Sequence, residues 1–182
     1  MELDIAAYKL KIGSKAMDFS LPGVDGKTHS LADFRGKKAI AVIFTCNHCP
    51  YAKAYEDRII ALHNELMHKG IAFAAINSNN AATHPQDSFD NMKARAAEKK
   101  FTFPYLYDES QEVAKAYDAQ VTPEVFLFNS ELKLVYHGNV DNNMEHPGQG
   151  IPHFRSAITA VLAGEEVPVK ETGAFGCSIK WK

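Results

Sequence analysis

Two continuous apolar runs, separated by one helical pattern, limit most strongly what this chain can fold into. The runs are Lys38–Thr45 (KAIAVIFT) and Ile71–Asn77 (IAFAAIN), and both are rich in apolar side chains. Such runs are typical of strands that are buried on both faces of a sheet. Pro50–Lys69 lies between them and carries one apolar helical stripe, which consists of Ile59, Leu62, Leu66 and Met67. A helix that joins two buried strands predicts a crossover connection in an α/β sandwich.

The rest of the pattern completes a mixed sheet with helices on its faces. Further helices are expected at Pro85–Lys100, Ser110–Tyr117 and Ile151–Leu162. Further strands are expected at Pro104–Tyr107, Glu124–Asn129 and Leu132–His137, and a tight turn joins the last two into an antiparallel hairpin. Turn residues within Asp18–Leu31 predict a separate N-terminal β-hairpin. We therefore expect one domain over residues 1–182, with 167–182 as a C-terminal tail without a clear period.

Composition and charge exclude several classes of function. The chain has 182 residues, 46% hydrophobic residues and a formal net charge of −2. This charge gives no electrostatic reason to bind nucleic acid or an anionic membrane. No apolar run approaches the roughly 20 residues of a membrane-spanning helix. The N-terminus builds no signal-peptide core. A cytoplasmic location is therefore expected, with no nucleic-acid or membrane partner.

The stretch Cys46-Asn-His-Cys-Pro carries the most chemistry. The chain has only three cysteines, and a reducing cytoplasm does not preserve structural disulfides. Cys46 is expected at the N-terminus of the following helix, where backbone N–H groups and the helix dipole stabilise a thiolate. Cys49 can close a disulfide with Cys46, and His48 between them can stabilise the thiolate further. The alternatives are structural zinc, which needs four ligands, and an inert buried pair of cysteines.

The order of these motifs resembles the thioredoxin-like superfamily, on its redoxin and AhpC/TSA (peroxiredoxin-related) branch. CNHCP stands at the position of the redox motif, after a segment, KAMDFSLPGVDGKTHSLADFRGKKAIAVIF, that looks like the family's N-terminal part. VTPEVFLF resembles the segment with a cis-proline, and GAFGCSIKWK resembles the C-terminal signature of an uncharacterised CNHCP subgroup. The resemblance implies a thioredoxin-like three-layer sandwich, with a central mixed sheet flanked by helices and an N-terminal β-hairpin extension.

The resemblance also implies roles for individual residues. Cys46 would be the attacking thiolate, Cys49 would resolve the mixed disulfide, and His48 would tune the pKa of the motif. Thr122 and Pro123 would form a cis peptide that faces the two cysteines. No cofactor is implied beyond an electron donor, such as a thioredoxin-type or small-thiol reductant.

Departures from the peroxiredoxin pattern separate three candidate functions. Thr45 lies four residues before Cys49 rather than three, the usual proline is missing, and Arg58 and Arg155 have no assigned role. The preferred function is therefore thiol–disulfide exchange with a protein disulfide or a small thiol. The first alternative is a peroxiredoxin-like thiol peroxidase, an antioxidant enzyme that reduces hydroperoxides. The second is a thioredoxin-fold copper-binding protein with His137 as a distant ligand.

Three further regions have two interpretations each. Cys177 lies in a glycine-flanked tail and is either a resolving cysteine for Cys46 or Cys49, or a packed free thiol. The segment from His137 to His153 contains three histidines and several acids. We expect a solvated loop in which the histidines cap or pack, with metal binding as the alternative. The aromatic stretch Phe101–Tyr107 is expected to pack in the core, with a substrate groove as the alternative.

Overall fold

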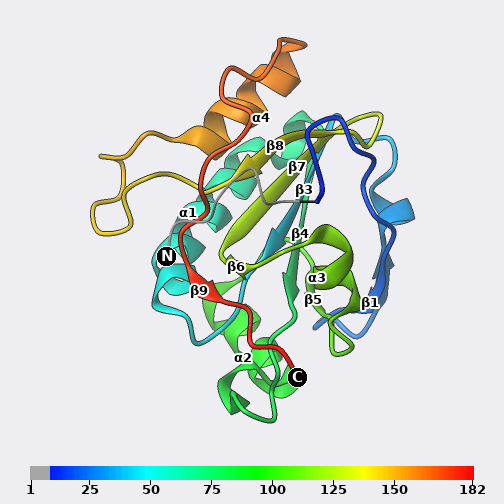
Figure 1. Ribbon diagram of the computed structural model, residues 1–182, viewed down its shortest axis with the longest axis vertical. Helices are drawn as coiled ribbons and strands as arrows, with labels where there is room; N and C mark the ends of the chain where they lie inside the picture. The colour runs from blue at the N-terminus through cyan, green and yellow to red at the C-terminus, as the bar shows by residue number, and fades with distance from the viewer. Residues whose placement is uncertain (1–8) are drawn as a thin grey trace.

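The computed structural model describes residues 9–182, and a mixed five-stranded sheet lies at its centre (Figure 1). The strands, in the spatial order β5-β4-β3-β7-β8, are Tyr105–Tyr107, Ile71–Asn77, Ala39–Phe44, Glu124–Asn129 and Leu134–Gly138. β3, β4 and β5 are parallel to one another. β7 is antiparallel to both β3 and β8. The predicted crossover and the closing hairpin are both confirmed.

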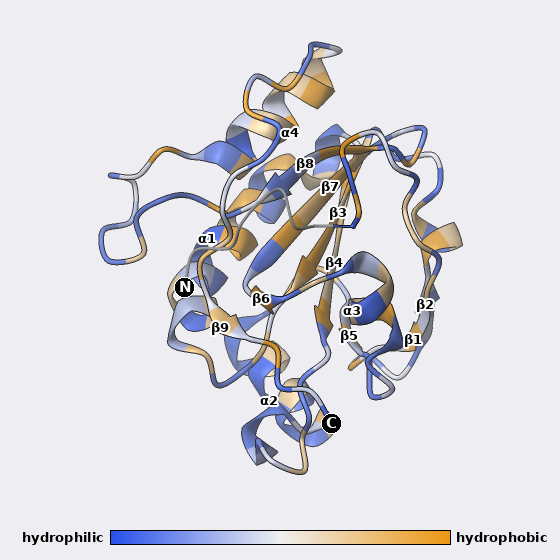
Figure 2. Ribbon diagram, viewed as in Figure 1, coloured by the Kyte–Doolittle hydropathy of each residue, from blue (hydrophilic) through white to orange (hydrophobic). Residues whose placement is uncertain are grey.

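Helices cover both faces of this sheet. They are α1 (Pro50–Leu66), α2 (Phe89–Lys99), α3 (Glu112–Tyr117) and α4 (His153–Ala163). In β3, Ile43 packs in the core with α1, α2 and α4, whereas the next residue, Phe44, packs in the core with α3. Because both faces are buried, β3 and β4 read as continuous apolar runs, and Figure 2 shows them as strongly hydrophobic. Within residues 9–182, no helix is long and apolar enough to cross a membrane.

The expected N-terminal hairpin is present and completes the layer that contains α3. β1 (Ser20–Pro22) pairs antiparallel with β2 (Thr28–Ser30). Leu21 and the apolar side chains of the following 3₁₀ turn, Leu31–Phe34, pack in the same core as α3. A bridge between Gly23 and Leu106 ties the hairpin to β5. The three-layer α/β sandwich with an N-terminal hairpin is therefore confirmed.

The helix expected at Pro85–Lys100 is divided at Ser88. A 3₁₀ turn covers Pro85–Asp87, and α2 begins only after Ser88, whose hydroxyl accepts the backbone amide of Asn91 at 3.3 Å. Serine is a favoured N-cap residue because its side chain satisfies an unpaired amide of the first turn. The division leaves Asp87 outside the helix, with its side chain fully buried.

Several other boundaries also differ from the prediction. The strand expected from Leu132 begins at Leu134, because Leu132 has a φ of 59°, which an extended strand does not allow. The helix expected from Ile151 begins at His153. Met67, expected on the buried stripe of α1, belongs to a 3₁₀ turn after the helix and is 38% exposed. The aromatic stretch Phe101–Tyr107 packs in the core as predicted, through Phe103 and Tyr105.

The C-terminal tail runs back along the sheet to the end that bears the cysteines. Lys170 and Thr172 bond to the backbone of His137 in β8. Further on, β9 (Cys177–Ser178) pairs antiparallel with β6 (Val121–Thr122). In Figure 1 this tail passes α1 and lies beside β6 before it reaches the C-terminus. Backbone hydrogen bonds and single buried side chains such as Ile179, rather than a continuous apolar face, hold the tail in place, so its sequence has no period.

Candidate functional site

Cys46 and Cys49 lie where the chain leaves the sheet and begins α1. The amide of Thr45 still donates to the Ile76 carbonyl at 2.9 Å, which ends the pairing of β3 with β4. α1 then begins at Pro50, with Cys49 as its N-cap residue. Proline suits this position because it has no amide hydrogen to leave unpaired. Both cysteines are free thiols and almost wholly buried, 2% and 0% exposed. The predicted order of strand, motif and helix is confirmed.

Thr122 contacts both sulfur atoms from the segment that faces them. Its hydroxyl lies 3.3 Å from the Sγ of Cys46, and the Sγ of Cys49 donates to its carbonyl oxygen at 3.3 Å. The peptide between Thr122 and Pro123 is cis, as expected. A third sulfur lies close by, because Cys177 in β9 packs against the same cluster and is half-buried.

The two motif cysteines titrate as one unit. The hydrogen bond between their side chains lowers the pKa of Cys49 to about 4, although burial opposes this, and it raises the pKa of Cys46. The pair therefore holds one proton at neutral pH. The Thr122 hydroxyl can donate to a thiolate at Cys46, and the Thr122 carbonyl accepts a proton from Cys49. The negative charge can thus lie on either sulfur. The sequence predicted a lowered pKa for Cys46. In the structure the pKa of Cys49 is lowered instead, and that of Cys46 is raised.

This titration predicts a thiolate that persists into acid solution. Because the pKa of Cys49 lies at about 4, below its ordinary 9.0, the pair should stay singly ionised at every pH above that value. The ultraviolet absorbance of one thiolate, and the rate of alkylation by iodoacetamide, should fall only as the pH drops through about 4. Urea-unfolded protein is the control, and its thiolates should appear near the ordinary pKa, at about pH 8.5–9. Native protein that behaves like the unfolded control would contradict the prediction.

A buried carboxylate, Asp87, organises the loop between the cysteines. Its Oδ1 accepts the backbone amide of Asn47 at 2.7 Å. Its Oδ2 accepts the side-chain amide of Asn79 at 2.9 Å and bonds to the Nδ1 of His48. Polar side-chain atoms of Cys46, His48 and Asp87 all lie within 4.8 Å of one another. His48 is therefore held beside Cys46, as the sequence predicted, and Asp87 fixes the orientation of its ring.

Sequence reasoning missed the residues that support the motif. Asn47 is buried, and its side chain accepts the hydroxyl of Tyr105 at 2.9 Å and donates to a backbone carbonyl at 2.8 Å. One signal was available, because the polar run Asn77–Asn80 follows β4, and the carboxyl ends of parallel strands meet at one edge of a sheet. Asp87 carried no such signal, since it lies in a stretch that reads as part of a surface helix.

The residues considered as metal ligands have other partners. His137 belongs to β8, and its Nε2 lies 2.7 Å from the buried carboxylate of Glu124. The ring of His153 bonds to a side-chain amide at 3.0 Å. In the described part of the chain, the group that could hold a metal ion comprises Cys46, His48 and Asp87. The structure gives no support to the alternative in which His137 is a distant copper ligand, because Glu124 bonds to its ring, and these two histidines pack or cap as predicted.

The two unassigned arginines form ion pairs elsewhere. Arg58 contacts the carboxylate of Asp141 at 2.8 Å, and both groups are mostly buried. Arg155 contacts Glu65 at 2.7 Å on the surface. Neither supplies the arginine that the peroxiredoxin pattern expects beside a peroxidatic cysteine. The geometry therefore adds nothing to the peroxidase alternative.

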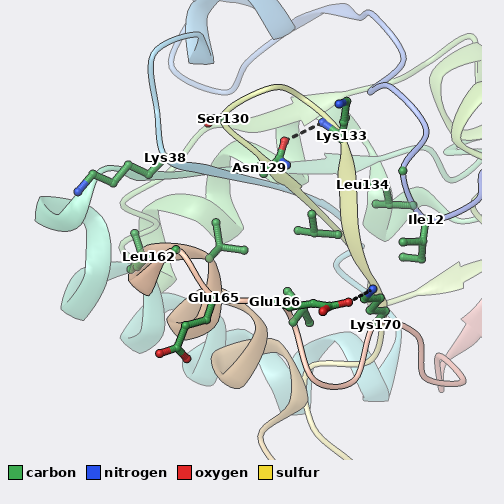
Figure 3. Close-up of a pocket in the computed structure, with 15 residues that line it drawn as sticks. Ile12, Lys38, Asn129, Ser130, Lys133, Leu134, Leu162, Glu165, Glu166 and Lys170 are labelled. Atoms are coloured by element: carbon green, nitrogen blue, oxygen red, sulfur yellow. Dashed lines mark hydrogen bonds and ion pairs between the residues drawn. The ribbon is translucent and has the colours of Figure 1, made fainter.

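A cavity of about 520 Å³ lies at the other end of β3. Asn129, which lines it, pairs with Ala39 at the start of β3, whereas Cys46 follows the end of that strand. Figure 3 shows that the acid Glu166 is paired with Lys170, and Leu134 forms part of the apolar wall. No cysteine lines this cavity, so it is separate from the redox chemistry.

A family model described as Redoxin matches residues 11–150, which include the Cys-x-x-Cys motif and the cis-proline but not Cys177. The chain is also 27% identical over 133 residues to the thiol-disulfide oxidoreductase ResA of Geobacillus kaustophilus (strain HTA426). This match covers 71% of each chain.

Two solved structures are similar over the whole chain. An uncharacterized conserved protein from Geobacillus kaustophilus is 44% identical, with a TM-score of 0.91 and coverage of 100% of this chain and 96% of that one. A hypothetical protein from Sinorhizobium meliloti 1021 is 36% identical, with a TM-score of 0.90 and coverage of 100% and 97%. Both matches include the C-terminal tail, which lies outside the family model.

Proposed function

The chain belongs to the Redoxin family, and from this premise we propose that it is a thiol–disulfide oxidoreductase with Cys46 and Cys49 as its redox centre. One observation carries the proposal: two free, buried cysteines pack in one cluster and both contact Thr122 through their sulfurs. Two thiols so placed can form a disulfide without a metal or an organic cofactor. The name of the ResA relative agrees with this chemistry.

The first step is an attack by the thiolate of Cys46 on the disulfide of a partner. The Thr122 hydroxyl can donate to a thiolate at Cys46 and stabilise its negative charge. A bond forms between Cys46 and one partner sulfur, the partner's S–S bond breaks, and its second sulfur leaves as a thiolate. The product is a mixed disulfide.

The second step resolves the mixed disulfide inside the protein. The thiolate of Cys49 attacks the Sγ of Cys46, and the partner's first sulfur leaves as a thiolate. The partner has then gained two electrons, and the chain holds a disulfide between Cys46 and Cys49. Cys49 keeps the proton that the pair shared when Cys46 attacks as a thiolate, and it passes this proton to the partner's departing thiolate before it attacks. His48, held in place by Asp87, lies close enough to Cys46 to stabilise charge or pass a proton there.

The partners follow from this chemistry. We propose a protein disulfide or a small disulfide as the oxidant, and a thioredoxin-type protein or a small thiol as the reductant. A reducing cytoplasm would supply such thiols, and a cytoplasmic location is part of the proposal. Hydroperoxides remain the alternative oxidant, in which case a sulfenic acid replaces the mixed disulfide.

A single-turnover experiment tests the proposal. Fully reduced protein is mixed with a small excess of a model protein disulfide and, separately, of hydrogen peroxide, and free thiols are counted against time. Rapid loss of two thiols with the disulfide, and slow loss with peroxide, is the expected result. Peptide mapping should place the new bond between Cys46 and Cys49. Loss with peroxide that is orders of magnitude faster than for free cysteine would instead establish the peroxidase alternative.

A further inference from the structure

The C-terminal tail is docked over the cysteine pair by contacts on both sides of Cys177. In the pairing of β9 with β6, Cys177 lies opposite Thr122, the residue that contacts both motif sulfurs. The amide of Ile179 donates to a carbonyl just before β6 at 2.9 Å, and the amide of Lys180 donates to the side chain of Asn79 at 2.8 Å. The side chain of Ile179 is 3% exposed. The tail is therefore part of the site.

Gly176 permits this close approach. A side chain at position 176 would overlap the backbone of Thr122, including its carbonyl oxygen. The same carbonyl oxygen accepts the hydrogen bond from Cys49. One backbone group thus contacts both the tail and the inner sulfur of the motif, which places Cys177 beside Cys49.

Cys49 is the common neighbour of the other two sulfurs. It packs in one cluster with Cys46 and Cys177, and hydrogen bonds of both their side chains lower the pKa of Cys49. The three sulfurs do not all lie within 4.8 Å of one another. They therefore form a row with Cys49 in the middle. Cys49 can form a disulfide with Cys46 on one side or with Cys177 on the other.

The row runs from the interior towards the surface. Cys46 and Cys49 are 2% and 0% exposed, whereas Cys177 is only half-buried. A disulfide between Cys46 and Cys49 would expose less sulfur to an external thiol than a disulfide that includes Cys177. A disulfide between Cys49 and Cys177 would present its outer sulfur to solvent.

We propose that Cys177 is a third redox thiol, which moves the disulfide of the buried pair to the surface for reduction. The inference rests on the proposed function, because it begins with the oxidised pair. The thiolate of Cys177 attacks the Sγ of Cys49, the bond between Cys46 and Cys49 breaks, and Cys46 leaves as a thiolate. The proton from Cys177 passes to solvent or to Cys46, and no electrons are gained or lost. The thiolate of a small thiol then attacks the Sγ of Cys177, the bond between Cys49 and Cys177 breaks, and Cys49 leaves as a thiolate. A second small thiolate attacks the sulfur of the first, which releases Cys177 as a thiolate and forms the disulfide of the two small thiols.

In the reduced protein Cys177 stays protonated and therefore unreactive. Burial, together with the hydrogen bond and negative charge of Cys49, raises the pKa of Cys177 to about 11, so it remains a thiol at neutral pH. Once Cys49 is in a disulfide it carries no charge, and that part of the increase in pKa disappears. Oxidation of the pair therefore makes Cys177 easier to ionise.

Two serine variants test the row of sulfurs directly. Each is treated with one equivalent of diamide, quenched in acid, alkylated and mapped by peptide mass spectrometry. In Cys46→Ser, a bond between Cys49 and Cys177 should form within one chain. In the matched control, Cys49→Ser, the two remaining sulfurs are not neighbours, and both should stay free. Free thiols in Cys46→Ser, or equally fast bond formation in the control, would overturn the inference.

Two further measurements, on the native protein and on Gly176→Ala, test the inference even if a serine variant does not fold. Oxidised native protein should yield both the Cys46–Cys49 and the Cys49–Cys177 disulfide after rapid acid quenching. In Gly176→Ala the tail cannot pair with β6, so only the Cys46–Cys49 bond should remain and reduction by glutathione should slow. A native protein with the Cys46–Cys49 bond alone, or a Gly176→Ala variant reduced as fast as the native chain, would refute the role of Cys177.

These results are distinguishable from failure of the proposed function. If the reduced protein exchanges with no model disulfide but diamide still gives both disulfides, the function fails and the row of sulfurs stands. If exchange is rapid and the Cys49–Cys177 bond never forms, the function stands and the inference fails.

Discussion

Replacing Cys46 by serine is expected to lower the rate of disulfide exchange at least about a thousandfold, because a hydroxyl cannot replace the attacking thiolate. The fold should persist, since the serine hydroxyl can still bond with Thr122, which lies 3.3 Å from the native sulfur. The free energy of unfolding should change by less than about 1 kcal/mol. The measurements are the turnover of a model protein disulfide and unfolding in urea, both on full-length protein.

Cys49→Ser is the informative comparison for this variant. It keeps the attacking sulfur but removes the sulfur that resolves the mixed disulfide. It should therefore trap a covalent complex with the partner, visible by mass, whereas Cys46→Ser should trap none. Retained turnover in Cys46→Ser would contradict the assignment of Cys46 as the attacking cysteine. If Cys46→Ser trapped the covalent complex and Cys49→Ser did not, the roles of the two cysteines would be the reverse of those proposed.

Asp87→Asn should affect stability and reactivity together. The carboxylate is fully buried and accepts bonds from Asn47 and Asn79, in addition to its bond with His48. An amide at this position would turn its NH₂ group towards some of these donors. Loss of a hydrogen bond to a buried charge costs about 2–3 kcal/mol. We expect the free energy of unfolding to fall by about this amount, and the pH dependence of alkylation at Cys46 to change because His48 loses its fixed orientation.

Asp90→Asn is the matched control, since it makes the same chemical change three residues later. The side chain of Asp90 is 93% exposed and pairs only with Lys93, one turn along α2. Such a change usually alters stability by less than about 0.5 kcal/mol. If Asp87→Asn is as stable as this control and shows the native pH profile, Asp87 does not organise the site.

Local patterns in the sequence predicted the frame of the site. Continuous apolar runs identified β3 and β4, because a strand that is buried on both faces must be apolar at every position. The proline after Cys49 and the apolar stripe that follows it located the start of α1. The position of the cysteines at the junction followed directly. The cis peptide before Pro123 came from the family resemblance, since an X-Pro bond alone is more often trans.

Errors arose where a single backbone conformation overrides a pattern. The apolar series at Leu132 continues into β8, but its left-handed backbone belongs to the turn. The composition of the polar stretch that starts at Pro85 is typical of one continuous helix. The N-cap at Ser88 nevertheless divides this stretch, and Asp87 before it is buried in the interior. Patterns average over several residues, whereas a turn or a cap is decided by one.

By itself, the sequence determined the class of fold, the place of the Cys-x-x-Cys motif and the kind of chemistry that two such cysteines perform. Only the tertiary structure decided three contacts. The carboxylate of Asp87 bonds to the ring of His48, the carboxylate of Glu124 bonds to the ring of His137, and Cys177 lies against Cys49. The physical reason is the range of the interactions. Periodicity and capping act over a few residues, whereas these contacts join parts of the chain far apart in sequence, and the packing of β6 with β9 and of the turns around the sheet brings them together.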